Sequence, residues 1–322
     1  MYSRIAGTGS FLPAKVLSNA DLEKMVDTSD EWIRTRTGIE RRHVASADET
    51  TSTLAIGAAR RAMEAAGVTA AEVDFVAVGT TTPDLVFPNV ATMVQRALDI
   101  HDTPAFSMES ACSSFIYALS VADKFIRLGE AKCALVVGAE TLTRMVDWND
   151  RGTAVLFGDG AGAVILKPAA EPGIVTTIVS ADGQYFDLLK FPYGVSSGFD
   201  RLRAGAPGGI QMKGNEVFKV AVNTLSRLVD KTLAKGGIDR AAIDWLIPHQ
   251  ANLRIIQAAA KKLELPMEQV VVTVHEHGNT SAASIPLALD IAVRDGRIKR
   301  GQMLLLETFG GGFTWGSALI RY

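Results

Sequence analysis

Short apolar runs alternate along the chain with longer segments in which apolar residues recur at helical spacing. The apolar runs predict strands at residues 73–78, 134–137, 163–166, 245–247, 270–274 and 303–306. The segments between them predict helices at residues 52–66, 114–128, 216–234, 253–263 and 284–293. Strands that alternate with helices are typical of α/β proteins, in which helices cover a largely parallel sheet.

An internal repeat divides this pattern into two similar parts. Residues 65–75 (AAGVTAAEVDF) resemble residues 235–245 (KGGIDRAAIDW), at an offset of 235 − 65 = 170 positions. At the same offset, the apolar run 134–137 corresponds to residues 304–307, which overlap the apolar run 303–306. The repeat predicts two homologous halves, residues 1–172 and 173–322. Because no linker-like segment separates the halves, we expect them to pack into one body.

Composition narrows the class of protein. The chain of 322 residues is 48% apolar and 21% charged, with a formal net charge of −2. These values exclude a wholly disordered chain and give no general attraction to nucleic acid or to an anionic membrane. Because the sequence shows neither a secretory signal nor an apolar run that could span a bilayer, we expect a cytoplasmic protein. In that reducing environment Cys112 and Cys133 would be free thiols.

The two cysteines lie in different local patterns. Cys112 is in a run of small residues, SACSS at 110–114, directly before a predicted helix. A thiol at a helix N-terminus has a lowered pKa and is a candidate nucleophile. The alternative, a small buried residue that begins the helix, is about equally compatible with the spacing. Cys133 begins an apolar run and is predicted to be buried and structural.

Histidine positions suggest one site and argue against another. His249 follows the predicted strand 245–247, at the end of a strand where open α/β sheets place their sites, although a surface or capping histidine fits equally well. His275 and His277 would share one face if the strand 270–274 continued, but Gly278 interrupts it and no third ligand is apparent. We therefore expect no metal site.

Other motifs are weaker. The glycine clusters at 7–9 and 158–162 lack the strand-to-helix context of a dinucleotide loop, so no nucleotide cofactor is expected. Arg254, Lys261 and Lys262 are seven and eight positions apart, which places them on one face of a helix. Such a face is usually solvated surface, but beside a reactive site it could dock an acidic partner.

Taken together, the motifs resemble those of the β-ketoacyl-acyl-carrier-protein synthase III family over nearly the whole chain. The resemblance is carried by DEWI at 30–33, RTGI at 36–39, DRG at 150–152, FGDGAG at 157–162, GNEVF at 214–218, PHQANLR at 248–254, HGNTSAAS at 277–284 and FGGGFTWG at 309–316. It implies a thiolase-like fold, a five-layered αβαβα body built from two duplicated halves. It also implies an acyltransferase that initiates fatty acid elongation.

The resemblance implies a reaction and a catalytic triad of Cys112, His249 and Asn279. An acyl-CoA primer, with acetyl-CoA as the first candidate, would acylate Cys112, and malonyl-acyl-carrier protein would then lose carbon dioxide and attack the thioester. The products would be a 3-oxoacyl-acyl-carrier protein, coenzyme A and carbon dioxide. The oxyanion hole would consist of the backbone N–H groups of Cys112 and Gly311. The surroundings of the nucleophile, SACSS, differ from the pattern usual in the family but stay small.

Further residues are assigned by the same resemblance. Coenzyme A would be bound by Trp32, Arg36, Thr37, Arg151, Gly214, Asn215, Phe218 and Asn252. The acyl pocket would be formed by Phe87, Leu142, Leu156, Phe157 and Leu189. Acyl-carrier protein would be bound by Gln250, Ala251, Asn252, Leu253, Arg254, Lys261 and Lys262. A homodimer is implied, with Phe87 contributed across its interface, and coenzyme A thioester is the substrate of an enzyme that needs no cofactor.

Three alternatives remain open from the sequence. A related enzyme could transfer the acyl group from Cys112 to a different nucleophile or make a secondary-metabolite ketide. A cysteine hydrolase would release free acid without a malonyl donor. A non-catalytic carrier-binding protein would not need the three residues of the triad. The primer also stays open, because acetyl, propionyl, branched and medium-chain groups differ by a few methylenes, each worth about 0.8 kcal/mol on burial.

Overall fold

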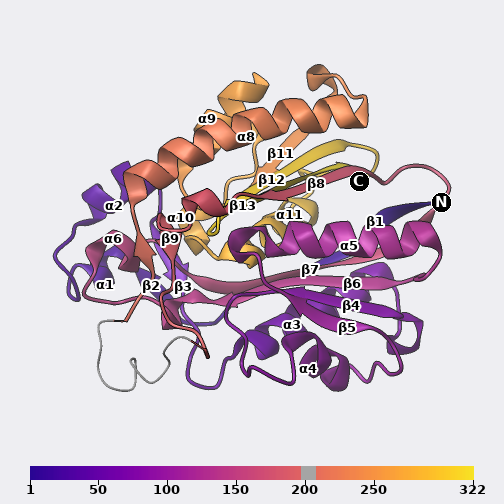
Figure 1. The fold of residues 1–322 in the computed structure, drawn as a ribbon, viewed down its shortest axis with the longest axis horizontal. Helices are drawn as coiled ribbons and strands as arrows, with labels where there is room; N and C mark the ends of the chain where they lie inside the picture. The colour runs from indigo at the N-terminus through magenta and orange to yellow at the C-terminus, as the bar shows by residue number, and fades with distance from the viewer. Residues whose placement is uncertain (197–207) are drawn as a thin grey trace.

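The computed structural model describes residues 1–196 and 208–322, and it has five layers (Figure 1). Helices form the two outer layers and the middle layer, and a sheet lies in each gap between them. The middle layer consists of α5 (Ser114–Leu128) and α11 (Ser284–Arg294), which both sheets cover. This αβαβα arrangement is the one implied by the family resemblance.

Each sheet takes its strands from one half of the sequence. The first has the order β1-β7-β6-β4-β5, and its strands are β1 (Tyr2–Phe11), β4 (Phe75–Gly79), β5 (Ala105–Met108), β6 (Ala134–Thr141) and β7 (Asp159–Ala169). The second has the order β11-β12-β13-β8, and its strands are β8 (Ile174–Ala181), β11 (Trp245–Pro248), β12 (Met303–Gly310) and β13 (Thr314–Arg321). Read from β8, the second sheet repeats the order of the first up to its edge, and the proposed boundary at 172/173 falls between β7 and β8.

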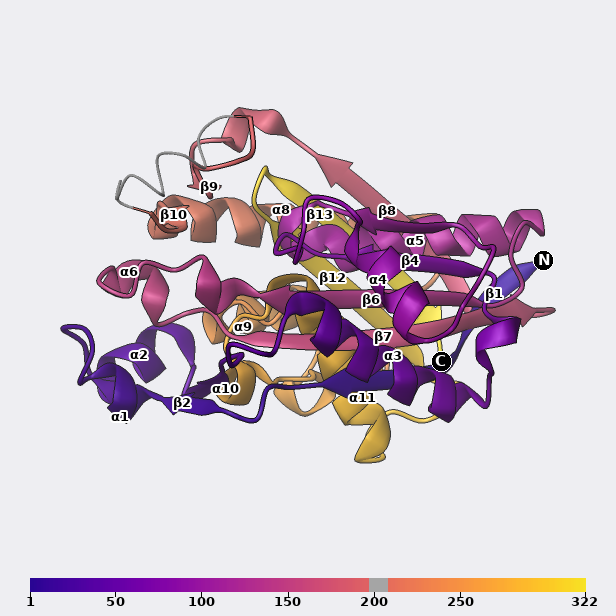
Figure 2. The same cartoon turned by 90° about the horizontal axis from the view of Figure 1, so that it is seen from below.

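The outer layers also mirror one another. One consists of α3 (Thr51–Ala66) and α4 (Val90–Ala97), and the other of α8 (Gly214–Gly236) and α9 (Leu253–Leu263) (Figure 2). The helices α3 and α8 both end at a left-handed glycine, Gly67 and Gly237, and these lie 170 positions apart. Glycine adopts this conformation without the penalty of a β-carbon, so both helices stop at the same point of the repeat.

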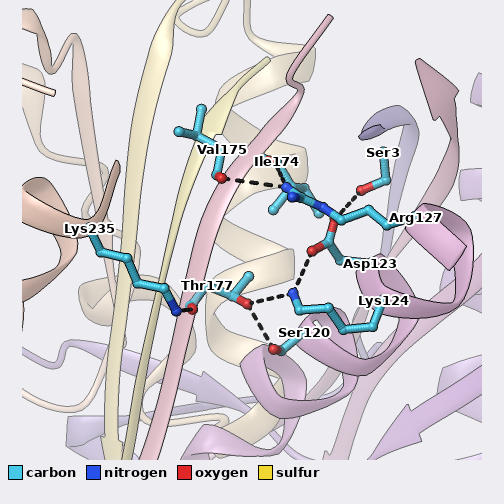
Figure 3. Close-up of polar contacts among 9 residues, drawn as sticks. All are labelled: Ser3, Ser120, Asp123, Lys124, Arg127, Ile174, Val175, Thr177 and Lys235. Carbon is cyan, nitrogen blue, oxygen red and sulfur yellow. Dashed lines mark hydrogen bonds and ion pairs between the residues drawn. The ribbon is translucent and has the colours of Figure 1, made fainter. Parts of the chain in front are cut away.

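The two sheets share one apolar core. Apolar side chains of α5 and α11 share a single cluster with residues of both sheets, and this cluster extends from Ile5 to Ile320. A polar junction lies at its margin, where the buried carboxylate of Asp123 accepts hydrogen bonds from Ser3 of β1 and Arg127 of its own helix (Figure 3). Arg127 also donates to the carbonyl of Ile174. Asp123 and Arg127 therefore connect the first half to β8, the edge strand of the second.

Short elements gather at one end of the molecule, away from the two termini (Figure 1). They are β2 (Val16–Ser18), α1 (Asn19–Leu22), α2 (Asp30–Thr37), β3 (Arg41–His43), α6 (Arg151–Ala154), β9 (Leu189–Lys190), β10 (Gln211–Met212) and α10 (Val274–His277). Single turns of 3₁₀ helix are η1 (Ala70–Glu72), η2 (Ala111–Ser113), η3 (Leu142–Arg144), η4 (Gly183–Tyr185), η5 (Arg240–Ala242), η6 (Met267–Gln269) and η7 (Ser281–Ala283). Several of these elements line the site described below.

One predicted strand is wrong. Residues 270–274 form only an isolated bridge between Val270 and Leu246, and the chain turns into α10 at Val274. An apolar run is buried whether it forms a strand or an irregular segment, so hydrophobicity alone does not separate the two. Because His275 and His277 lie on this helix rather than on a strand, the two-residue alternation considered for a metal site does not exist.

Candidate active site

A cavity of about 780 Å³ is lined by residues of several of these short elements, among them α2, α6, β9 and β10. Cys112, His249 and Asn279, which come from three distant parts of the chain, all line it. The resemblance named these three residues, and the structure brings them together.

Cys112 lies in the turn η2, directly before α5. Ala111 has a positive φ of 47°, a conformation that is uncommon for a residue with a side chain. The turn packs against the end of β12, where a β-carbon at Gly310 would come within 2.7 Å of the Cys112 nitrogen. Thr308 of the same strand donates a hydrogen bond of 2.9 Å to the carbonyl of Cys112. The nucleophile of the first half is therefore held by a strand of the second.

The expected low pKa of Cys112 is wrong for this structure. Burial raises the pKa of the thiol to about 12, and the nearby carboxyl of Glu140 adds to the effect, whereas a hydrogen bond with Ser281 opposes it. The position at a helix start does exist, but desolvation of the thiolate outweighs it. Cys133 is buried as predicted, directly before β6.

His249 follows β11 and is neutral. Burial lowers the pKa of its imidazole to about 3. Its Nδ1 lies 2.6 Å from the hydroxyl of Ser284, and that hydroxyl also accepts from the backbone N–H of Gln250. Among the described residues, Nδ1 is the one acceptor within hydrogen-bond distance of the Ser284 hydroxyl proton. When Ser284 donates to Nδ1, Nε2 of the neutral imidazole carries the ring proton and is the N–H donor.

Asn279 is fixed at both its backbone and its side chain. Its N–H donates to the carbonyl of Leu156 at 2.8 Å, and its carbonyl accepts from the N–H of Gly158 at 3.0 Å. Its side-chain Oδ1 accepts from the backbone N–H of Ser281 at 2.8 Å. Because a backbone N–H can pair only with the oxygen of the amide, the NH₂ group of Asn279 is left to donate.

An aromatic ring between two cations lies at the rim. Trp32 of α2 has the guanidinium of Arg36 5.4 Å from its ring centre and that of Arg151 at 5.0 Å. Trp32, Arg36 and Thr37 line the cavity. A flat aromatic face with two positive charges suits a nucleobase that carries phosphates.

The remaining residues assigned to substrate mostly line the same cavity. They are Leu142, Leu156, Phe157, Leu189, Gly214, Asn215, Phe218, Ala251, Asn252 and Gly311. The side chain of Asn252 also donates to the carbonyl of Arg36 and accepts from the N–H of Arg254, so it joins α2 to the start of α9. Phe87 is not part of this lining within one chain and is 83% exposed.

One residue assigned to carrier binding, Gln250, is unsuited to that role. Gln250 is only 1% exposed, and its amide bonds the backbone of Val271 and Thr273, so it is unable to contact a docked protein. Lys261 is exposed, whereas Lys262 forms an ion pair of 2.8 Å with Asp230 of α8.

Two further assignments fall near the same helix. Leu253 is half-buried, and its side chain occupies the space beside Gly38, where a β-carbon would come within 2.5 Å. Arg254 lies at the cavity, with its guanidinium 5.2 Å from the ring centre of Phe218. Arg254 is thus an exposed cation at the cavity.

Sequence reasoning missed two buried carboxylic acids near the site. Burial raises the pKa of Glu140, at the end of β6, to about 7, and that of Glu307, on β12, to about 8. Neither lies in a motif that carries the resemblance. A glutamate at the end of an apolar run (ALVVGAE) was the available signal, because a carboxylate is rarely buried without specific hydrogen-bond partners.

Neither a metal-binding cluster nor a membrane-spanning helix occurs among the described residues. No cluster of three histidine, cysteine or acidic side chains in residues 1–196 and 208–322 is arranged to hold a metal ion. No helix in those same ranges is long and apolar enough to cross a bilayer.

The fold and the site define a condensing enzyme of the thiolase-like class, and comparison with known proteins defines the family. The family model for 3-oxoacyl-[acyl-carrier-protein] synthase III matches residues 106–183, and the model for the C-terminal part of that enzyme matches residues 233–322. β-Ketoacyl-[acyl-carrier-protein] synthase III of Thioalkalivibrio sulfidiphilus is 63% identical and that of Xanthomonas campestris pv. campestris 64% identical, each alignment covering 100% of this chain and 99% of the relative. The chain therefore belongs to the β-ketoacyl-acyl-carrier-protein synthase III family of acyltransferases.

Solved structures agree with this assignment. The 3-oxoacyl-[acyl-carrier-protein] synthase III of Aquifex aeolicus superposes with a TM-score of 0.93 at 46% identity, covering 99% of this chain and 100% of that one. The priming β-ketosynthase of the R1128 polyketide pathway superposes with a TM-score of 0.94 at 35% identity, covering 99% of this chain and 96% of that one. The fold thus also serves an enzyme of the secondary-metabolite class that the sequence left open.

Proposed function

We propose that the chain condenses an acyl-CoA primer with malonyl-acyl-carrier protein, which yields a 3-oxoacyl-acyl-carrier protein, coenzyme A and carbon dioxide. The observation that carries the proposal is one cavity that joins a thiol, a neutral imidazole and an amide to a tryptophan flanked by two arginines. A hydrolase needs a base that activates water, and the His249 imidazole, with a pKa of about 3, is poorly suited to that task.

The first half-reaction transfers the acyl group to the enzyme. Trp32 and its two arginines bind the nucleotide end of coenzyme A, and the thioester reaches Cys112. The sulfur attacks the carbonyl carbon, coenzyme A leaves, and the acyl group stays on Cys112 as a thioester. The N–H groups of Cys112 and Gly311 stabilise the oxyanion; Gly310 next to them lets the Cys112 turn approach β12 closely.

The second half-reaction uses two uncharged donors. Nε2–H of His249 and the NH₂ group of Asn279 donate to the thioester oxygen of the malonyl group. Loss of carbon dioxide places negative charge on this oxygen, so donors fixed in advance stabilise the enolate. The carbanion then attacks the acyl thioester on Cys112, which breaks the carbon–sulfur bond and restores the thiolate.

Partners and location follow from the same function. The malonyl group arrives on an acyl-carrier protein, for which Arg254 and Lys261 are candidate contacts. A second copy of the chain covers the exposed apolar residues Leu85, Val86 and Phe87 in the segment between β4 and α4, which would bring Phe87 to the acyl pocket of its partner. A reactive thiol that must stay reduced favours the cytoplasm.

Intact-protein mass spectrometry tests this function. The protein is offered a mixture of acyl-CoAs, and we expect a mass increase of one acyl group on Cys112, which also identifies the primer. Addition of malonyl-acyl-carrier protein should then release carbon dioxide and discharge the acyl group into a 3-oxoacyl product. Free acid without a malonyl donor, or an adduct on Cys133, would contradict the proposal.

A further inference from the structure

Gln250 has a buried side chain whose amide is fully hydrogen-bonded. Its Nε2 donates to the backbone carbonyls of Pro248 at 2.7 Å and Val271 at 3.0 Å. Its Oε1 accepts from the backbone N–H groups of Thr273 at 2.8 Å and Val274 at 3.1 Å. These four bonds use both donors and both acceptor sites of the amide, and the reversed orientation would satisfy none of them. A buried amide with all its partners supplied makes the segments that it joins rigid.

The first of these segments carries His249. Pro248 is the last residue of β11, and His249 follows it directly. The N–H of His249 donates to the carbonyl of Glu307 at 2.8 Å. The N–H of Gln250 donates at 3.4 Å to the hydroxyl of Ser284, which lies 2.6 Å from Nδ1 of the imidazole. Gln250 therefore holds the backbone on both sides of His249, through its amide on one side and through its own N–H on the other.

The second segment leads to Asn279. Thr273 caps and Val274 begins α10, a single helical turn that ends at His277. The N–H of His277 donates to the carbonyl of Thr273 at 3.1 Å, and that of Gly278 donates to the carbonyl of Val274 at 3.0 Å. The two residues held by the amide thus hold the turn in their own right, and Asn279 is the next residue after that turn.

One buried amide therefore joins the two segments that present the donors for decarboxylation. We propose that Gln250 is a positioning residue that sets the separation of the His249 imidazole and the Asn279 amide. This proposal rests on the proposed function in taking these two groups as donors to the malonyl thioester oxygen. Gln250 acts through them, because its side chain is buried and is not part of the cavity lining.

Decarboxylation is the step that should depend on this separation. Both donors must reach one oxygen at about 2.7–3.1 Å, so movement of either segment lengthens at least one of the two hydrogen bonds. A misplacement of about 1 Å can lower a rate by on the order of 10². Acylation of Cys112 does not use either donor and should therefore be much less sensitive.

Positioning and carrier docking predict different kinetics for Gln250. A docking residue acts on the binding of acyl-carrier protein, so its loss raises the KM for malonyl-acyl-carrier protein and leaves the rate at saturation unchanged. A positioning residue acts on the malonyl group once it is bound. Its loss lowers the rate at saturation and leaves the KM within a few-fold.

The test compares Gln250→Glu and Gln250→Met with the wild-type protein. Gln250→Glu keeps the shape and the acceptor for the two backbone N–H groups, but its carboxylate is unable to donate to the two carbonyls. Gln250→Met keeps the length and makes none of the four bonds. Carbon dioxide release is measured with saturating malonyl-acyl-carrier protein, and acylation by acetyl-CoA is measured on the same preparation. We expect release to fall by on the order of 10² and acylation to stay within a few-fold of wild type.

Two controls separate positioning from a general loss of stability. Thr232 of α8 is a buried hydroxyl that donates to the carbonyl of Leu228 and bonds the hydroxyl of Ser317, away from the cavity lining. Thr232→Val should lower the free energy of unfolding and keep the wild-type ratio of the two half-reactions. Gln250→Glu combined with Asn279→Ala should stay within a few-fold of Asn279→Ala alone, because the separation loses its importance once one donor is gone.

The outcomes distinguish the two proposals. Carbon dioxide release at the wild-type rate in Gln250→Glu would overturn the positioning role and leave the proposed function intact. A raised KM with an unchanged rate at saturation would also overturn it, in favour of docking. An equal fall in both half-reactions would show that the amide is only structural. If the wild-type protein releases no carbon dioxide from malonyl-acyl-carrier protein, the proposed function itself fails.

Discussion

The turn before α5 and the turn before α11 have the same backbone and different chemistry. Both are single 3₁₀ turns, Ala111–Ser113 and Ser281–Ala283, and both begin with a residue at φ 47°. They lie 281 − 111 = 170 positions apart, the offset of the sequence repeat. Within them Cys112 corresponds to Ala282, so only the first turn carries a nucleophile.

The neighbours of the two turns differ in a complementary way. Ser114 donates to the carbonyl of its own turn, whereas its equivalent Ser284 bonds the imidazole of His249. On β6, Gly138 leaves room for the second turn, and Glu140 lies two residues further on the same face of the strand. Its equivalent on β12, Gly310, leaves room for Cys112. The comparison teaches that one backbone pattern serves two roles. The first turn carries the nucleophile Cys112, and the second is followed by Ser284, which holds the imidazole of His249.

The largest effect is expected from removal of the Cys112 thiol, the group that the second turn lacks. Cys112→Ala should abolish acylation and lower condensation by on the order of 10⁴ or more, as loss of a nucleophile does. Cys133→Ala, a thiol deletion before β6, should change the rate by only a few-fold. Single-turnover mass spectrometry with acetyl-CoA measures both. Acylation that persists in Cys112→Ala would remove the distinction between the two turns.

A smaller effect should separate the donors from the nucleophile. His249→Ala and Asn279→Ala should each lower decarboxylation of the malonyl donor by on the order of 10²–10³, the cost of losing a donor to developing charge. Acylation of Cys112 should persist in both variants. Carbon dioxide release and acyl-enzyme formation are measured on the same preparation, and near-normal condensation in both variants would refute these roles.

Substituting the glycines beneath the turns tests whether the turns need close approach to the strands. Gly138→Ala would bring a methyl group within 2.2 Å of the Ala282 carbonyl, and Gly310→Ala within 2.7 Å of the Cys112 nitrogen. Each should lower the free energy of unfolding by about 1–3 kcal/mol. Gly183→Ala, which meets no atom within 4 Å, is the matched control. Denaturant unfolding that ranks the three variants equally would contradict the packing described above.

The smallest effect lies outside both turns, on the helix after His249. Arg254→Glu should raise the KM for malonyl-acyl-carrier protein a few-fold and weaken its salt dependence, because exposed charge pairs contribute only about 0.2–1 kcal/mol. Acylation by acyl-CoA should change less, since it needs no protein partner. Lys231→Glu, a charge reversal on α8, is a control. Equal losses in both half-reactions would instead assign Arg254 to the coenzyme A site.

The sequence predicted most of what depends on local pattern or on motifs. At least one helix of each layer and the repeat at 170 positions were readable, because apolar periodicity is a local signal. Helix α4 and the strands β1, β5, β8 and β13 were not among the predicted elements. The triad followed from the family resemblance. The pKa of Cys112 and the burial of Gln250 were not readable, because both depend on which distant segments cover a side chain. Glu140 was missed for the same reason, since the threonines that hydrogen-bond its buried carboxyl, Thr80 to Thr82, lie about 60 positions earlier in the chain.

The shared middle layer has a consequence for synthesis on the ribosome. Helix α5 is complete at Leu128, yet the core that covers it includes residues as late as Ile320. At about 5–20 residues per second, the apolar face of α5 waits roughly ten to forty seconds for those residues to emerge. A nascent chain that has emerged only as far as α5 therefore exposes a large apolar surface. We expect it to depend on chaperones until the last strand, β13, is released.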